Sequence, residues 1–418
     1  MYMIRLIVWA SLMALACCAW CDEPFRNHRY DSWKVLEMPE DAIVFVGNSI
    51  TDMHPWAEAF GNDKRIVNRG NSGALSSEVV EHMDCWLEGK PSKVFLMIGT
   101  NDLGSGLPVE HVVENVRKVA ERVRAESPET MLYLESILPA KDQKARTMET
   151  IAQANEGIRQ IADEYENTEY VDLFALLMGV VEDKGTSFDQ LHLTAAGYRV
   201  WCEAIAPLVG LEHCYGNDVV ERMAWGNLYG SDAMRATYFS VLGYDEGDIL
   251  FFGDEMVKNG EWNELLQNPR IKNRGTGWGY GGSLEKVAQM ADVTLGESAP
   301  QASKICLYAG AQDVASERKL KEVEHDYRAI VERLLRYSKS EVVLVGLMPK
   351  TGDNARERQF NKWLKRYSEK NARLKYIDLY QLLTEKDGTI KQGYVKDNYL
   401  YGQGYIVLAE ALRSCLEK

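Results

Sequence analysis

Short apolar runs alternate with longer amphipathic stretches along the first half of the chain. Two of these stretches, Val109–Glu126 and Thr147–Tyr165, combine apolar residues at helical spacing with charged residues between them. Strands that alternate with such helices predict an α/β fold, in which helices cover both faces of a parallel sheet. Four runs are rich in β-branched and aromatic residues, a composition that favours buried strands. They are Ile43–Val46, Val94–Ile98, Met131–Leu134 and Tyr170–Leu173.

The second half of the chain repeats this pattern with similar local sequences. The chain therefore reads as an internal tandem duplication of two complete α/β domains, each a parallel sheet between helices. The matching segments are Ile249–Glu255 with Ile43–Ser49, Lys272–Gly275 with Val67–Gly70, Leu307–Asp313 with Leu96–Asp102, Tyr376–Leu379 with Tyr170–Leu173, and Gly404-Tyr405 with Gly197-Tyr198.

This repetition divides the 418 residues into four segments. We assign residues 1–21 to a signal peptide, 22–211 to a first domain, 212–248 to a linker and 249–418 to a second domain. The linker is rich in aromatic residues around Trp225–Tyr229 and poor in Pro and Ser, so we expect it to be packed rather than flexible. Its stretch Asp232–Phe239 has helical character.

The N-terminus has the features of a targeting segment. Arg5 precedes the apolar run Leu6–Ala16, and small residues follow before Asp22. This pattern predicts export, to the periplasm or as a secreted protein. Ala16-Cys17 also resembles a lipoprotein cleavage site, which leaves a lipid anchor at the cell surface as an alternative. The run is shorter than the roughly 20 residues that cross a bilayer, and we expect no membrane span.

Composition narrows the classes of partner and cofactor. The formal net charge of −14 argues against nucleic acid and anionic membrane surfaces as partners, so neutral or cationic substrates fit better. Five scattered cysteines outside the leader predict mostly free thiols, with Cys202 and Cys214 as the only moderately close pair. Neither Cys-x-x-Cys nor His-x-x-x-His spacing occurs after the leader, and we expect no metal and no other cofactor.

Polar side chains with complementary chemistry follow the predicted strands. Ser49 comes directly after the first strand, and Asp189 precedes His192 by three residues. A serine hydroxyl becomes a nucleophile when a neutral imidazole accepts its proton and a carboxylate orients that imidazole. Asn101 follows the run that ends at Ile98 and can donate from its side-chain amide to a developing oxyanion.

Four segments together resemble the sequence blocks of the SGNH (GDSL-type) hydrolase superfamily over roughly residues 40 to 210. The resemblance implies that Ser49 is the nucleophile, His192 the general base and Asp189 its partner. It also implies an oxyanion hole formed by the Ser49 N–H, the Gly73 N–H and the Asn101 amide. The blocks are Gly47-Asn48-Ser49-Ile50, Asn68-Arg69-Gly70-Asn71-Ser72-Gly73, Gly99-Thr100-Asn101-Asp102 and Asp189-Gln190-Leu191-His192.

The match departs from the family pattern at Asn48, where aspartate is usual, and at Ile50, where leucine is usual. Neither change removes a catalytic atom. We choose Gly73 rather than Gly70 as the backbone oxyanion donor by aligning the end of the block Asn68–Gly73 with the family pattern. Taken singly, Ser49 is also a typical turn or cap residue, and the pair Asp189 and His192 is also a typical helix cap. Their joint occurrence in one order favours catalysis.

The second half lacks this chemistry in register, because Glu255 stands for Ser49 and Tyr399 for His192. Lys396 likewise replaces Asp189, Gln312 replaces Asn101, and Gly73 falls near Trp278. We therefore expect a degenerate second domain that is catalytically silent. Its Gly-rich loop suggests a ligand site formed by Trp278, Tyr280 and Tyr399, or else a loop that only fills the vacated cleft.

The sequence thus predicts a secreted serine esterase that removes acetyl groups from an O-acetylated carbohydrate. Its partners would be small-molecule or glycan esters. Segments Asp52–Trp56 and Asn101–Gly106 mix polar and aromatic residues, which favours a short acyl group on a polar alcohol. The alternatives are a lipid esterase or lysophospholipase that uses the same residues, and a glycan-binding protein without catalysis.

Overall fold

The computed structural model describes residues 23–141, 145–182, 189–216, 231–277, 282–295, 299–337 and 341–416. The expected leader, linker residues 217–230, and the candidate ligand residues Trp278 and Tyr280 lie outside these ranges. The described residues belong to two compact units. The first comprises Met1–Arg26 and Glu37–Glu221, and the second comprises Asn27–Leu36 and Arg222–Lys418.

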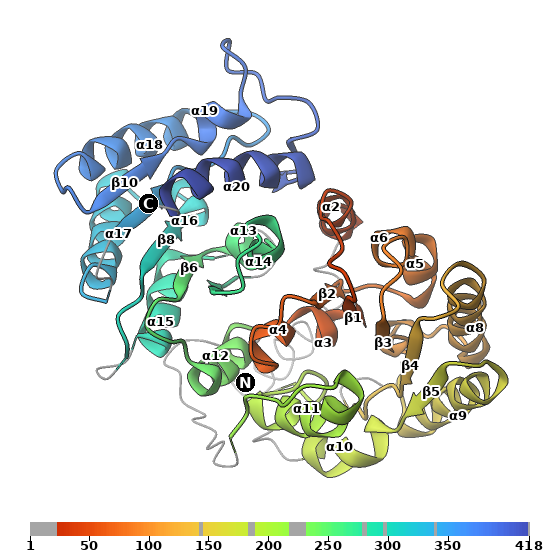
Figure 1. Cartoon of the computed structure of the whole chain (residues 1–418). Coiled ribbons are helices and arrows are strands. Elements are labelled where there is room, and N and C mark those ends of the chain that lie inside the picture. The colour runs from red at the N-terminus through yellow and green to blue at the C-terminus, as the bar shows by residue number, and fades with distance from the viewer. Residues whose placement is uncertain are drawn as a thin grey trace, which may run out of the picture. The chain divides into compact units, whose positions relative to one another are not determined.

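The first unit is built on a five-stranded parallel sheet with the order β2-β1-β3-β4-β5 (Figure 1). This is a doubly wound order, in which the strand sequence reverses next to β1. Every residue of β1 is buried, as expected for a central strand covered on both faces. The strands are β1 (Ile43–Gly47), β2 (Ile66–Gly70), β3 (Lys93–Met97), β4 (Met131–Glu135) and β5 (Thr168–Val171).

Helices cover both faces of this sheet. Helices α5, α8 and α9 lie along one face, while α4 and α11 lie along the other (Figure 1). Phe45 of β1 stacks on Trp56, whose ring also contacts Trp201. The helices of this unit are α3 (Ser49–Asp52), α4 (Trp56–Ala59), α5 (Ser76–Glu81), α6 (Asp84–Leu87), α7 (Thr100–Gly104), α8 (Val109–Glu126), α9 (Met148–Glu164), α10 (Leu173–Glu182) and α11 (Ala195–Val209).

The second unit repeats the topology. Its parallel sheet has the order β7-β6-β8-β9-β10, and a short antiparallel hairpin follows it. The strands are β6 (Ile249–Gly253), β7 (Ile271–Gly275), β8 (Lys304–Tyr308), β9 (Val342–Val345), β10 (Leu374–Ile377), β11 (Val395–Lys396) and β12 (Tyr399–Leu400). The helices are α12 (Ser231–Leu242), α13 (Glu255–Lys258), α14 (Trp262–Leu265), α15 (Leu284–Thr294), α16 (Ala311–Ala315), α17 (Leu320–Leu334), α18 (Ala355–Ser368), α19 (Leu379–Leu383) and α20 (Gly402–Leu416).

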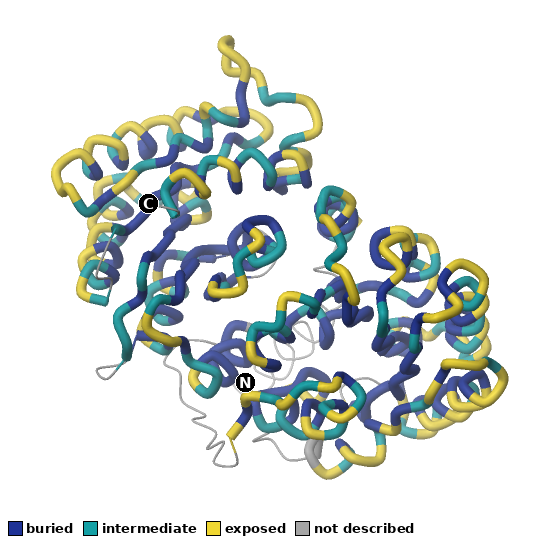
Figure 2. The backbone as a smooth tube through the Cα atoms, viewed as in Figure 1, coloured by how far each residue is buried: buried dark blue, intermediate teal, exposed yellow. Residues whose placement is uncertain are grey.

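The predicted fold class is confirmed, since two parallel sheets are each flanked by helices, as two SGNH-like domains require. In each unit the sheet is the most deeply buried layer, and the exposed positions lie on the outer sides of the helices (Figure 2). Among the described residues, no helix is both long and apolar enough to cross a membrane. The five described cysteines are free thiols.

The two units also repeat individual side-chain contacts. Asn68 donates to the carbonyls of Thr51, Asp52 and His54, and Asn273 makes the corresponding three bonds in the second unit. In both units a tryptophan and a tyrosine repeat their bonds as well. The pairs are Trp56 to Thr51 O with Trp262 to Val257 O, and Tyr198 to Ile50 O with Tyr405 to Met256 O.

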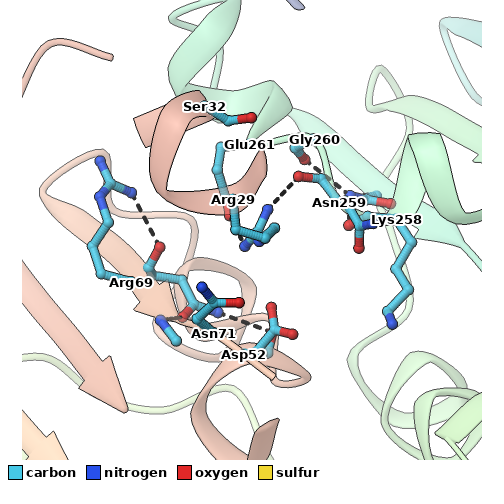
Figure 3. A network of polar contacts seen from close by, with 12 residues as sticks. Arg29, Ser32, Asp52, Arg69, Asn71, Lys258, Asn259, Gly260 and Glu261 are labelled. Atoms are coloured by element: carbon cyan, nitrogen blue, oxygen red, sulfur yellow. Dashed lines mark hydrogen bonds and ion pairs between the residues drawn. The ribbon is translucent and has the colours of Figure 1, made fainter. Parts of the chain in front are cut away.

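Part of helix α2 (Glu23–Trp33) belongs to the second unit, although it precedes β1 in the sequence. The Arg29 guanidinium is only 2% exposed and donates to the Asn259 carbonyl and to Glu261 Oε1, the latter over 2.7 Å (Figure 3). Asp31 accepts a hydrogen bond of 2.9 Å from the Gly402 N–H. The second unit is therefore completed by residues that lie 230 or more positions earlier in the chain than their partners.

One buried carboxyl group makes the stability of the first unit depend on pH. Glu135 ends β4, is 2% exposed and accepts a hydrogen bond of 2.7 Å from Trp201 Nε1. Burial raises the pKa of Glu135 to about 8 from its ordinary 4.5, although the Trp201 bond opposes this shift. Between these two values the folded chain holds a proton that the unfolded chain has released, so stability falls as pH rises.

We therefore expect Glu135→Gln to stabilise the protein at pH 8 but not at pH 4.5. A shift of this size corresponds to roughly 3–5 kcal/mol at full effect. Urea unfolding of both proteins at several pH values measures the difference. Glu169→Gln, on the neighbouring strand β5 and exposed, is the matched control. A Glu135→Gln effect that is the same at every pH would contradict the buried neutral carboxyl.

Candidate active site

Ser49 is placed by the turn that connects β1 to α3. Asn48 caps the helix, because its Oδ1 accepts a hydrogen bond of 3.0 Å from the Ile50 N–H. Asparagine therefore supplies the capping oxygen that aspartate would supply at this position. Gly47 has no room for a side chain, since a Cβ there would lie 2.2 Å from Thr51 Oγ1. Ser49 is thus the first helical residue, where its N–H has no partner within the helix.

Asp189 and His192 lie on the loop that leads into α11. One carboxylate oxygen of Asp189 accepts the backbone N–H groups of Leu191 and His192, over 3.1 and 2.7 Å. The other oxygen lies 2.7 Å from His192 Nδ1. On the far side of the ring, His192 Nε2 lies 2.8 Å from Ser49 Oγ. A continuous chain of hydrogen bonds therefore joins the carboxylate to the hydroxyl.

The carboxylate of Asp189 determines which ring nitrogen of a neutral His192 carries the proton. Desolvation acts to raise the pKa of Asp189, but the charge and hydrogen bonds of His192 and the Leu191 N–H outweigh it and lower this pKa to about 2. The carboxylate is therefore charged at neutral pH and draws a proton to Nδ1. Nε2 then carries the lone pair that faces Ser49 Oγ, the arrangement a general base needs.

The expected oxyanion donors Gly73 and Asn101 lie on the segments that directly follow β2 and β3. Asn101 Nδ2 donates to the Ala74 carbonyl over 2.9 Å, which fixes the amide beside the turn that contains Gly73. An amide nitrogen carries two hydrogens, so this bond leaves one for a substrate oxygen. Gly73 has a φ of +84°, which favours glycine.

Gly70, by contrast, is enclosed by α3. A Cβ on Gly70 would lie 2.2 Å from Asp52 N, so this glycine is required for the packing of β2 against the helix. Its N–H is also bound by Asn68 Oδ1 at 2.9 Å. A bound N–H cannot also serve a substrate oxygen, and this favours Gly73 over Gly70 as the backbone donor.

Several supporting residues carried no functional signal in the sequence. Ser72 donates to the Asp52 carboxylate, and Arg146, only 1% exposed, donates to the Thr100 carbonyl over 2.6 Å. Figure 3 labels Asp52, which accepts the Ser72 hydrogen bond, and Asn71, the residue before Ser72. These contacts hold the turns around Ser49 and Asn101, but they arise only from the tertiary fold.

Two residues of the mixed polar and aromatic segment Asp52–Trp56 are buried in the core. His54 and Trp56 are each 1% exposed, and they pack in an aromatic cluster with Tyr198. His54 Nε2 lies 2.8 Å from the Tyr215 hydroxyl, and burial lowers the pKa of His54 well below its ordinary value. These buried rings form part of the core of the first unit.

In the second unit the corresponding positions carry other groups. Asp254 caps α13 as Asn48 caps α3, and Glu255 takes the place of Ser49. Lys396 and Tyr399 face each other across the β11–β12 hairpin. Gln312 Oε1 accepts the Gly282 N–H over 3.0 Å. These described residues contain no serine, histidine and carboxylate in the register of the first unit.

A comparison with known protein families finds a match within the first unit. Residues 45–200 match the GDSL-like Lipase/Acylhydrolase family. Over these residues the first unit is similar to a GDSL-type (SGNH) hydrolase domain. This match supports the serine esterase or lipase class and implies small-molecule ester substrates. No curated protein matches the chain.

Several solved structures resemble part of the chain. A protein from Streptococcus pneumonia, provisionally described as a platelet activating factor, is 28% identical, covers 49% of this chain and 99% of its own, and has a TM-score of 0.41. A GDSL-like lipase from Bacteroides thetaiotaomicron is 21% identical, with coverages of 44% and 98% and a TM-score of 0.38. A lipase/acylhydrolase from Enterococcus faecalis is 18% identical, with coverages of 41% and 95% and a TM-score of 0.36.

Proposed function

We propose that the first unit is a serine esterase in which Ser49 attacks the ester carbonyl. The observation that carries this proposal is the hydrogen-bonded chain from Asp189 through His192 to Ser49, with distances of 2.7 and 2.8 Å. His192 Nε2 accepts the hydroxyl proton as the Oγ–carbon bond forms, and then delivers it to the leaving alcohol. Asp189 stabilises the imidazolium during both steps.

The negative charge on the former carbonyl oxygen is stabilised by three donors in this proposal. They are the N–H of Ser49 at the start of α3, the N–H of Gly73 and the side-chain amide of Asn101. Each such donor is typically worth roughly 2.7–4 kcal/mol in the transition state. Water, activated by the same His192, then hydrolyses the acyl-enzyme and releases the carboxylic acid.

For the substrate, we propose a short acyl group, and specifically acetyl, on a carbohydrate. The net charge of −14 disfavours anionic surfaces, and the apolar leader run supports export to a compartment that contains acetylated glycans. We further propose that the chain arose by tandem duplication and that the second unit is silent. The repeated topology and the repeated bonds of Asn68 and Asn273 support the duplication. The presence of Glu255 and Tyr399 in place of Ser49 and His192 supports the silence of the second unit.

The acyl preference is tested by hydrolysis of p-nitrophenyl esters from acetate to palmitate by the mature chain. We expect kcat/KM to be greatest for acetate or butyrate and to fall by at least about tenfold by octanoate, because a site shaped for acetyl excludes a longer chain. A site that buried the chain would instead gain about 0.8 kcal/mol of binding for each methylene. An optimum at long chains would replace the carbohydrate proposal with the lipid-esterase alternative. The same series on acetylated xylan and acetylated glucose then compares natural alcohols.

A further inference from the structure

The second unit contains a cavity of about 530 Å³ at the carboxyl ends of its strands. This lies within the range of roughly 300–1,000 Å³ typical of small-molecule sites. Glu255 and Gln312, which stand where the first unit has Ser49 and Asn101, both line it. Ligands of doubly wound folds bind at this edge of the sheet, where the strand order reverses. The cavity therefore occupies the binding position of the fold, although its hydrolytic groups are replaced.

The inner wall offers a hydrogen-bond acceptor that needs a donor. Glu357, on α18, is 5% exposed, and its Oε1 pairs with Lys350 Nζ at 2.7 Å. The other oxygen, Oε2, is buried without a hydrogen-bond partner among the described residues. Leaving such an atom unpaired is costly, so a ligand that donates a hydrogen bond to Oε2 would be stabilised here.

The rim offers donors instead. Gln312 and Asn398 are exposed amides, and each amide oxygen already accepts a backbone N–H, from Gly282 and Thr351 respectively, at 3.0 Å. Their NH₂ groups are therefore the parts left to contact a ligand. A cavity with a buried acceptor and donors at its rim suits a molecule whose groups both donate and accept, as hydroxyl groups do.

The charges of the lining select against an anion, and the Lys350–Glu357 ion pair disfavours a cation at Glu357. Two carboxylates, Glu255 and Glu357, outnumber the single ammonium of Lys350, which disfavours an anion. Burial raises the pKa of Asp254 well above its ordinary value, which disfavours a further negative charge beside Glu255. A cation at Glu357 Oε2 would lie beside Lys350, which already pairs with this carboxylate. A neutral hydroxyl group is repelled neither by the carboxylates nor by the Lys350 ammonium.

An aromatic pair and aliphatic side chains form another part of the wall. Tyr399 stacks on His28 with ring centroids 4.6 Å apart and an angle of 6° between the planes. Both rings line the cavity with Met256, Leu347 and Leu400. Aromatic and aliphatic surfaces of this kind pack against the C–H faces of a sugar ring. His28 belongs to the segment Asn27–Leu36, so this segment helps to build the cavity wall.

We propose that this cavity is a binding site for a neutral, hydroxyl-rich ligand, namely one or two units of an uncharged oligosaccharide. The site binds without hydrolysis, because Glu255 and Tyr399 replace the nucleophile and base. This inference goes beyond the proposed esterase and does not depend on it. Of the three residues suggested by the sequence, Tyr399 lines the cavity, whereas Trp278 and Tyr280 lie outside the described residues.

Isothermal titration of the mature full chain carrying Ser49→Ala tests this site. The probes are neutral trisaccharides of glucose, xylose and mannose, compared with trimers of galacturonic acid and of glucosamine. We expect saturable binding of at least one neutral trimer, and binding of the acidic trimer that is at least tenfold weaker. Glu357→Gln should weaken the neutral ligand about tenfold or more, since it replaces a charged acceptor.

Gln312→Ala is the second variant, because this exposed rim residue can be removed without disturbing the core; we expect a weakening of about threefold to tenfold. Gln381→Ala, equally exposed on α19 but outside the lining, should change nothing. Absence of binding by every neutral trimer, or equal binding by Glu357→Gln and Gln312→Ala, would overturn the proposal. Tighter binding of the glucosamine trimer would reassign the site to amines.

Ester hydrolysis by chains with an intact Ser49 distinguishes this inference from the proposed function. Binding that persists while no Ser49-dependent hydrolysis is found would leave the second site standing and reject the esterase. Hydrolysis without oligosaccharide binding would do the reverse. Glu357→Gln and Gln312→Ala should retain p-nitrophenyl acetate hydrolysis within about twofold, because neither residue belongs to the Ser49 site.

Discussion

Replacement of Ser49 by alanine is expected to lower kcat for ester hydrolysis by about 10⁵–10⁶-fold, with little change in KM. The substitution removes only Oγ, the atom that lies 2.8 Å from His192 Nε2. The three proposed oxyanion donors remain, so a small residual rate over the uncatalysed reaction should persist. Steady-state kinetics on p-nitrophenyl acetate, with thermal unfolding as a check of folding, measures this effect.

The matched control for this variant is Ser77→Ala. Ser77 lies on α5, is exposed and is outside the hydrogen-bonded chain of Ser49, so its removal should change kcat by less than about twofold. Hydrolysis by Ser49→Ala within about tenfold of the parent rate would assign the nucleophile to another residue.

Asp189→Asn is expected to lower kcat by about 10⁴-fold while the loop keeps its shape. The asparagine oxygen can still accept the N–H groups of Leu191 and His192, which Asp189 now binds. Its NH₂ group would face His192 Nδ1 and force the imidazole proton onto Nε2. His192 could then no longer accept the proton of Ser49.

Asp172→Asn is the matched control, because Asp172 also accepts a backbone N–H at the start of a helix, from Ala175 over 3.1 Å, but lies outside the site. We expect its kcat to match the parent. If Asp189→Asn retained more than about a tenth of the parent kcat, Asp189 would be a loop cap only, and another group would have to orient His192.

Much of the fold was predictable from local pattern. The apolar runs at β1, β3 and β4 and the amphipathic helix α8 have strong periodicities, and the structure confirms them. Strand β2 (Ile66–Gly70) was not among the predicted strands, because Asn68 and Arg69 interrupt its apolar character. Asn68 is retained there by its bonds to three carbonyls, a tertiary requirement that no local pattern reveals.

The candidate catalytic residues were also predictable, from their positions directly after predicted strands. Ser49 and Asn101 follow strands directly, and the carboxyl ends of parallel strands meet at one edge. The cavity of the second unit was only partly predictable. Glu357 lies between Arg356 and Arg358 and reads as a surface residue, yet it is 5% exposed. His28 contributes across more than 370 positions to Tyr399, beyond the reach of any local signal.

The measurement that tests the central claim most directly is covalent labelling with a fluorophosphonate, followed by peptide mass spectrometry of the full chain. Activated serines form a stable adduct with this reagent, whereas ordinary hydroxyls do not. We predict one adduct per chain, on Ser49, which is absent in Ser49→Ala and strongly slowed in Asp189→Asn. Ester hydrolysis that continues while Ser49 remains unlabelled would contradict the assignment of Ser49 as the nucleophile.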